Sequence, residues 1–80
     1  MMITREKEPQ MKYAGLTDNP EASRIAHGKP SDWWVSAFKN EKEARQWEKD
    51  MITRPGYTVK PRGNEWRYGY IFTITNLTTQ

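Results

Sequence analysis

The amino-acid sequence predicts a small α+β domain built on a β-α-β-β unit. A run of aromatic and β-branched residues over 33–38 is followed at once by a capped helical pattern, and two further strand patterns flank a Gly-Asn turn signal. The chain has 80 residues with 35% hydrophobic content, which is material for one small core. We expect a three-stranded antiparallel-type sheet in spatial order 1-3-2, with one helix packed on one face.

A polar N-terminal arm, residues 1–32, precedes this unit and is interrupted by several prolines and glycines. Residues 11–16 carry only a weak strand pattern. A short helix is expected over 20–27, because Asn19 is a good N-cap residue and the proline after it suits the first helical position. We therefore predict a largely irregular arm with a short helix, followed by a single small α+β domain over residues 33–80.

The first strand and the helix after it have the clearest patterns. Residues 33–38 read Trp-Trp-Val-Ser-Ala-Phe, a composition that favours a strand. Asn40 and Glu43 have the spacing of a capping box, so the helix should run over about 41–53, where an Arg-Pro-Gly sequence ends it. Three apolar side chains then share one face of this helix: Ala44, Trp47 and Met51.

Two more strands are predicted over 57–62 and 65–75, joined as a hairpin by the Gly-Asn turn. The register of that hairpin places Lys60 opposite Arg67 and Tyr57 opposite Tyr70. A right-handed crossover would make the first strand parallel to the second, with the long last strand between them. We assign to the helix the face of the last strand that carries its large side chains: Trp66, Tyr68, Tyr70, Phe72 and Ile74.

The sequence offers little for catalysis, cofactor binding or metal binding. It contains no cysteine and a single histidine, His27, and it shows neither a metal-ligand spacing nor a glycine-rich phosphate loop. We interpret His27 as a residue at the end of the short helix, where the helix dipole favours it. We therefore expect no enzyme activity, no cofactor and no metal.

Aromatic residues are the anomaly of the sequence. Ten of the 80 residues are Trp, Tyr or Phe, more than one helix on one sheet face can cover. Alternation along the first strand turns its two tryptophans to opposite faces, so that one is left toward the open face. The predicted partner-binding surface on that face consists of Trp34, Phe38, Lys60, Arg62, Arg67 and Ile71. The competing interpretation is that the N-terminal arm folds over this face.

The favoured function is a non-enzymatic protein-binding module. Such a module would be a regulator or inhibitor that occupies a partner's surface with its aromatic and Arg-rich sheet face and hairpin, because Trp, Tyr and Arg dominate interface hot spots. The alternative is nucleic-acid binding by the basic 60–67 hairpin and the exposed aromatics, because the net charge of +3 falls entirely within residues 51–80.

Two further expectations concern assembly and compartment. The core is thin for one chain, which favours a homodimer through a free sheet edge or through the surplus aromatics. The N-terminus has no apolar leader and the chain has no apolar run of membrane-spanning length, so we expect a cytoplasmic protein without a membrane partner.

Overall fold

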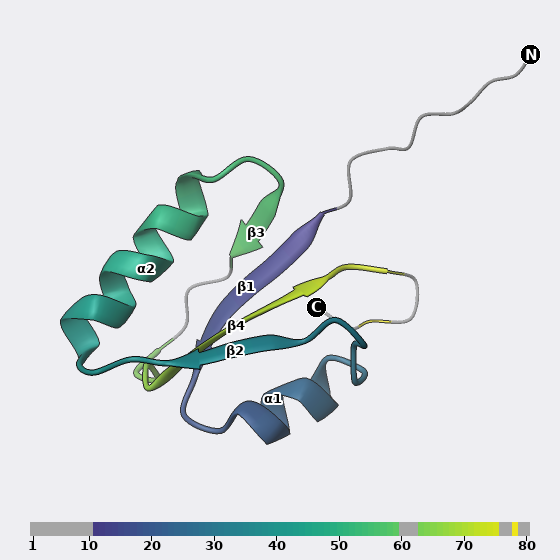
Figure 1. Ribbon diagram of the computed structural model, residues 1–80, viewed down its shortest axis with the longest axis horizontal. Coiled ribbons are helices and arrows are strands. Elements are labelled where there is room, and N and C mark those ends of the chain that lie inside the picture. The colour runs from purple at the N-terminus through teal and green to yellow at the C-terminus, as the bar shows by residue number, and fades with distance from the viewer. Residues whose placement is uncertain (1–10, 60–62, 76–77, 79–80) are drawn as a thin grey trace, which may run out of the picture.

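The computed structural model describes residues 11–59, 63–75 and 78. The elements follow in the order β1 (Lys12–Thr17), α1 (Pro20–Ala26), β2 (Trp34–Ala37), α2 (Glu41–Thr53), β3 (Tyr57–Val59) and β4 (Tyr68–Thr73). The four strands form one sheet in spatial order β2-β4-β1-β3 (Figure 1). The expected α+β class is confirmed, whereas the number and order of the strands differ from the prediction.

Strand β1 is the main departure from the expectation of a largely irregular arm. It pairs antiparallel with β4 along its whole length, from Lys12 opposite Thr73 to Thr17 opposite Tyr68. Its first half also pairs parallel with β3. The sequence pattern of this strand is weak because its two large apolar side chains, Tyr13 and Leu16, stand among small or polar residues. Pairing on both edges, rather than intrinsic strand propensity, holds it in the sheet.

The predicted hairpin between 57–62 and 65–75 is wrong, because β1 lies between β3 and β4. Tyr57 pairs with Lys12, and Tyr70 pairs with Gly15 instead of Tyr57. The predicted pairing of Lys60 lies outside the described residues. The Gly-Asn signal still marks a bend, and Gly63 has a positive φ of 49°. Pairing with the distant β1 has thus overridden the local turn signal.

Other parts of the predicted sheet are confirmed. β4 lies inside the sheet, and β2 pairs antiparallel with it, from Trp34 opposite Ile71 to Ala37 opposite Tyr68. Helix α2 spans the predicted residues, and the Asn40 side chain accepts a hydrogen bond from the Glu43 N–H at 2.9 Å. The Glu43 carboxylate accepts from the Lys39 N–H at 3.3 Å, one residue before the position that a capping box requires.

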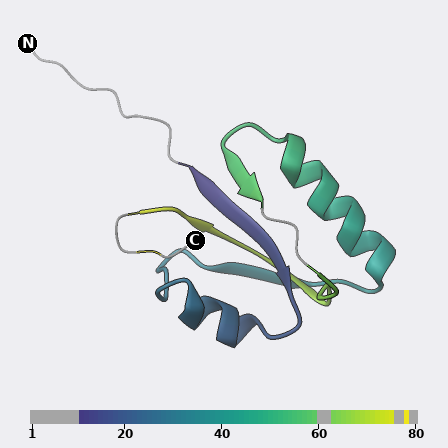
Figure 2. The same cartoon turned by 180° about the vertical axis from the view of Figure 1, so that it is seen from behind.

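The two helices cover opposite faces of the sheet (Figures 1 and 2). On the α1 side, the His27 ring lies 4.8 Å, centroid to centroid, from both Tyr13 and Phe72. On the other side, Trp47 of α2 reaches the backbone at Gly69. The assignment of the large side chains of β4 to the 41–53 helix is therefore wrong. The added strand β1 moves α2 over β1 and β3, while α1 follows β1 onto the opposite face.

The main core is the set of stacked rings on the α1 side. Tyr13, Tyr70 and Phe72 are buried, with Trp33 and Ile74 packed against them. The Trp33 and Tyr70 ring centroids are 4.7 Å apart. His27 closes this set, with its Nε2 atom 3.0 Å from the Tyr70 hydroxyl. A smaller apolar layer under α2 consists of Ala14, Ala44 and Met51. Neither described helix combines the length and apolarity needed to cross a bilayer.

Candidate protein-binding surface

An exposed aromatic cluster lies on the α2 side of the sheet. Trp34 is 46% exposed, and its ring stacks on Trp47 with 6.2 Å between centroids and 25° between planes. Phe38 also contacts Trp47, at 5.5 Å between centroids. Ile71 lies directly opposite Trp34 in the ladder. We call Trp34, Phe38, Trp47 and Ile71 the aromatic face; Trp34 is its most exposed member, because the other three are partly buried.

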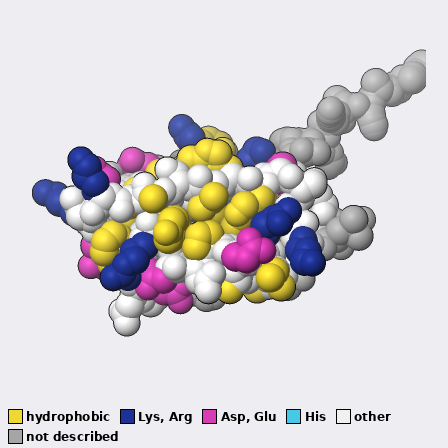
Figure 3. Space-filling view, turned by 60° about the horizontal axis from the view of Figure 1, so that its bottom comes forward, with side chains coloured by type: hydrophobic (Ala, Val, Ile, Leu, Met, Phe, Trp, Pro, Cys, Tyr) yellow, Lys and Arg dark blue, Asp and Glu magenta, His cyan; other side chains and the backbone are white. Residues whose placement is uncertain are grey.

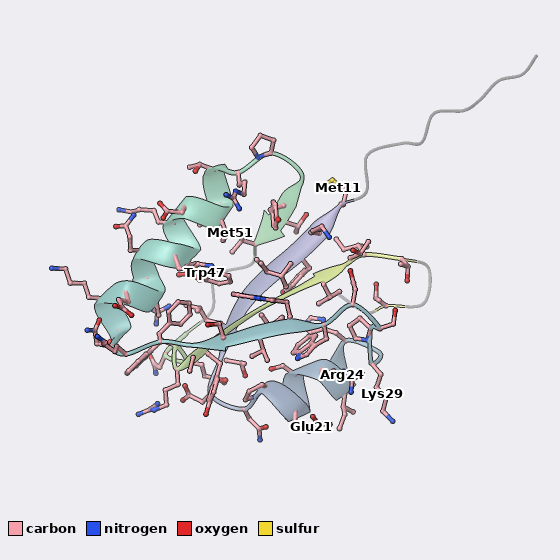
Figure 4. All side chains as sticks on the ribbon, viewed as in Figure 1. Met11, Glu21, Arg24, Lys29, Trp47 and Met51 are labelled. Atoms are coloured by element: carbon pink, nitrogen blue, oxygen red, sulfur yellow. The ribbon has the colours of Figure 1, made fainter. Side chains whose placement is uncertain are left out.

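Gly69 allows the aromatic face to lie close to the backbone of β4. A Cβ atom at this position would lie 2.8 Å from the Phe38 ring and 3.0 Å from the Trp47 ring, which is too close without displacement of a ring. Trp47 itself is directed from α2 toward the sheet, as is Met51 one turn further on (Figure 4). The helix and the missing side chain together hold Trp47 as a fixed support for Trp34.

Strand β2 has a free edge next to this cluster. Among the described residues it lies at the end of the sheet, where β4 is its one partner strand. The Phe38 N–H donates to the Arg67 carbonyl at 2.9 Å, so the even-numbered positions direct their backbone groups toward β4. The N–H and C=O groups of Val35 and Ala37 therefore point away from the sheet. Both side chains are exposed, Val35 by 40%.

Nothing in the sequence of β2 protects that edge. The strand contains neither a charged residue nor a proline, the usual devices by which proteins prevent an edge from pairing. Figure 3, which views the molecule from the side of β2 and α1, shows hydrophobic side chains across the middle of this surface and charged side chains toward its ends.

A shallow groove lies between β2 and α1, on the face opposite Trp34. Its volume is about 460 Å³. Glu21 and Arg24 project from α1 on this side of the molecule, so the groove carries one charge of each sign (Figure 4). The full lining consists of Asn19, Pro20, Glu21, Arg24, Ser31, Trp33 and Val35. The groove therefore combines two charged side chains with apolar surface beside the edge of β2.

Arg67 is held by Asp18 at the junction of β1 and α1. The guanidinium Nη1 lies 3.1 Å from Asp18 Oδ2, and Asp18 Oδ1 accepts from the N–H groups of Trp66 and Arg67 at 3.2 and 3.3 Å. Desolvation raises the pKa of Asp18, but these hydrogen bonds and the charge of Arg67 outweigh it and lower the pKa below its ordinary value of 3.8. The contact fastens the segment before β4 to the rest of the fold.

Asp32 closes the ladder at the other end of β2. Its carboxylate accepts from the Thr73 N–H, with both oxygens at 3.1 Å, and from the Thr73 hydroxyl. Desolvation raises the pKa of Asp32, but the hydrogen bonds from Thr73 outweigh it and lower the pKa below 3.8. Two carboxylates thus fix the two ends of the β2–β4 region.

The structure brings together half of the predicted partner-binding residues. Trp34, Phe38 and Ile71 meet in the aromatic face. Arg67 lies at the end of the same ladder, paired with Asp18. The other two predicted residues, Lys60 and Arg62, lie outside the described residues.

Sequence reasoning missed Trp47 as part of the surface, whereas the expected strand order 1-3-2 already placed the 33–38 strand at an edge of the sheet. Trp47 was assigned to the core from its helical spacing, and spacing alone does not distinguish a buried ring from a partly exposed one. The signal that this edge is unprotected was the uncharged run over 33–38.

Comparison with known proteins gives no information on the function of this chain. The chain matches no family model, no curated protein and no solved structure with which it was compared. Among the described residues, no group of three or more His, Cys, Asp or Glu side chains is placed to hold a metal ion. Function is therefore argued from the aromatic face and the edge of β2.

Proposed function

We propose that this protein is a non-enzymatic protein-binding module, a regulator or inhibitor that covers a partner's surface with its aromatic face. Trp34 carries this proposal, because its ring is 46% exposed while Trp47 holds it in place. A large aromatic side chain contributes most to an interface when a partner removes it from water. Because stacking already restricts the ring, little conformational entropy is lost on binding.

Nucleic-acid binding, the alternative, draws on the same tryptophan, since bases stack on aromatic rings. It also requires cations near that ring to contact phosphates. Arg67 is the predicted cation within the described residues, and its charge is paired with Asp18. Its guanidinium carbon also lies over the Trp66 ring, 5.0 Å from the centroid. Because Arg67 is already engaged by Asp18 and by the Trp66 ring, it is less suited to bind a phosphate, which favours a protein partner.

The first test compares the immobilised protein with its Trp34→Ala and Ile52→Ala variants in a lysate of the source cells. Ile52 is a matched control, because it is 51% exposed and lies on α2. We expect a protein to be retained by the wild type and by Ile52→Ala in raised salt. Trp34→Ala should weaken the binding of that protein by about 2 kcal/mol or more, roughly 30-fold. Equal retention by all three would remove the aromatic face from the function.

The second test measures fluorescence anisotropy of labelled single- and double-stranded oligonucleotides at low and physiological salt. A protein-binding module should leave the anisotropy unchanged. Binding that weakens steeply with salt and is lost in Trp34→Ala, with no protein retained from the lysate, would favour the nucleic-acid alternative over the proposal.

A further inference from the structure

We infer that β2 pairs edge to edge with β2 of a second copy of this chain, giving a two-fold symmetric dimer with one continuous sheet. This inference goes beyond the proposed function, because it uses the backbone edge of β2 and leaves open the side of the sheet on which the aromatic face of each copy lies. No strand in the described part of the chain pairs with the outward N–H and C=O groups of Val35 and Ala37, so these groups are a template for another strand.

The outward-facing backbone groups restrict the register of such a pair. In an antiparallel ladder, the residues that exchange N–H···O bonds are those whose groups face the partner strand. Val35 can therefore bond with Ala37 of the second copy, and Ala37 with Val35 of that copy. This register places Ser36 on the two-fold axis, opposite Ser36 of the second copy.

Side chains on both faces agree with this register. On the side of the aromatic face, Trp34 lies opposite Phe38 of the second copy, and aromatic pairs across strands stabilise a sheet. On the α1 side, Val35 lies opposite the small side chain of Ala37. Large and small residues thus meet without crowding.

Charge favours a second copy as the occupant of the edge. The run from Trp33 to Phe38 is uncharged, with Asp32 before it and Lys39 after it. An antiparallel two-fold pair brings the Asp32 end of one strand to the Lys39 end of the other, so like charges do not face each other across the edge. In the same register, Lys39 of the second copy falls opposite Trp33, next to the groove that Glu21 lines.

The dimer also doubles the surface assigned to partner binding. Strands that join edge to edge leave both sheet faces uncovered, so the two copies of Trp34 lie on the same side of the continuous sheet. The aromatic faces then form one band with an α2 helix at each end. A partner with two matching sites would meet a bivalent surface, which raises its apparent affinity without any new contact.

A single-cysteine variant tests the register directly, because the natural chain contains no cysteine. Ser36→Cys should form a covalent dimer under mild oxidation. Directly opposed residues at a non-hydrogen-bonded position have Cα atoms about 4.5 Å apart, within the range of a disulfide. Ile52→Cys, equally new but far from the proposed axis, is the control and should remain largely uncrosslinked. Equal crosslinking of the two variants would overturn the register.

A second pair of variants tests the edge without a crosslink. Sedimentation over a concentration series should show a dimer for the wild type and for Ile52→Lys. Val35→Lys adds a charge to the edge and should raise the dimer dissociation constant about tenfold or more. Circular dichroism and thermal unfolding establish that each variant is folded. A wild type that is monomeric up to its solubility limit, or a dimer that Val35→Lys leaves intact, would overturn the inference.

These results separate the dimer from the proposed function. A monomeric wild type that still retains a partner through Trp34 would overturn the dimer alone. A dimer that retains no partner would overturn the proposed function alone.

Discussion

The exposed position of Trp34 follows from the residues around it. The space over β4 on this face is already filled, because Trp47 and Phe38 lie against Gly69. Trp34 therefore stacks on Trp47 and stays 46% exposed. A tryptophan in this position is costly for an isolated molecule and useful for a molecule with a partner.

Gly69→Ala tests this arrangement. The added methyl group must displace the rings of Phe38 and Trp47, so we expect the free energy of unfolding to fall by about 1–3 kcal/mol. Denaturant unfolding, followed by tryptophan fluorescence, measures the change. Ser36→Ala, at the position opposite Gly69, is the control and should change stability by about 0.5 kcal/mol or less. Equal free energies of unfolding for the Gly69→Ala and Ser36→Ala variants would contradict the close approach of the rings to β4.

Asp18 and Asp32 predict how stability depends on acid. Both pKa values are lower in the folded protein than the ordinary 3.8. Their stabilising effect is therefore fully present well above pH 3.8 and is lost as the pH falls through the folded values. Thermal unfolding from neutral pH downward should show the melting temperature falling in that range. Asp18→Asn should melt lower than the wild type at neutral pH, with a smaller loss between neutral and acid pH. An unchanged acid profile in Asp18→Asn would exclude a role for its carboxylate.

At the scale of the element, residues close in sequence determine where α2 begins and where it ends. Asn40 accepts from the Glu43 N–H, and Arg54 with the proline after it ends the helix near residue 53. Because these signals act within a few residues, they can be recognised without knowledge of the rest of the fold.

Asn40→Ala should lower the free energy of unfolding by about 1 kcal/mol, the usual value of an N-cap side chain. The comparison is with Asn64→Ala, an exposed residue of the bend before β4, which should have little effect. Urea unfolding of the three proteins provides the values. If Asn64→Ala lowers the free energy of unfolding as much as Asn40→Ala does, capping does not explain the effect of Asn40.

Strand β1 could not be predicted from its own sequence alone. Tyr13 is its one large buried side chain, and Gly15 is buried because the Tyr70 ring covers it; a Cβ there would lie 2.6 Å from the Tyr70 hydroxyl. Small residues that are required by a distant ring look like loop residues in a local pattern. The strand can be recognised only together with β4 and β3, which lie far along the chain.

The sequence predicted the residues of the candidate site where it predicted the strands that carry them, and it failed where the position of α2 was needed. Alternation in β2 was sufficient to separate Trp33 from Trp34. It did not determine which of them faced water, because that depended on the position of α2, which in turn depended on β1. Ile71 was placed beside Trp34 because β4 was correctly predicted to neighbour β2. The error in the helix face therefore left these two residues together.

At the scale of the whole molecule, β4 joins the parts of the sheet. It is hydrogen-bonded to β2 on one side and to β1 on the other. A protein shortened to residue 66 keeps the sequences of α1, α2, β1, β2 and β3 but loses β4, with which β2 pairs. We expect it to lack cooperative unfolding, which circular dichroism during a denaturant titration would show. A cooperative transition in the shortened protein would contradict the central role of β4.

The position of β4 late in the described chain also affects synthesis. While residues 12–59 leave the ribosome, β1 can pair with β3, but β2 has no partner within the sheet. The uncharged edge and the exposed tryptophan of β2 are then available to other nascent chains, and a chaperone that shields them would reduce aggregation. Once β4 emerges, the ends of a long loop must meet before Lys12 can pair with Thr73. Such a distant pairing favours folding on a timescale of roughly milliseconds to seconds rather than microseconds.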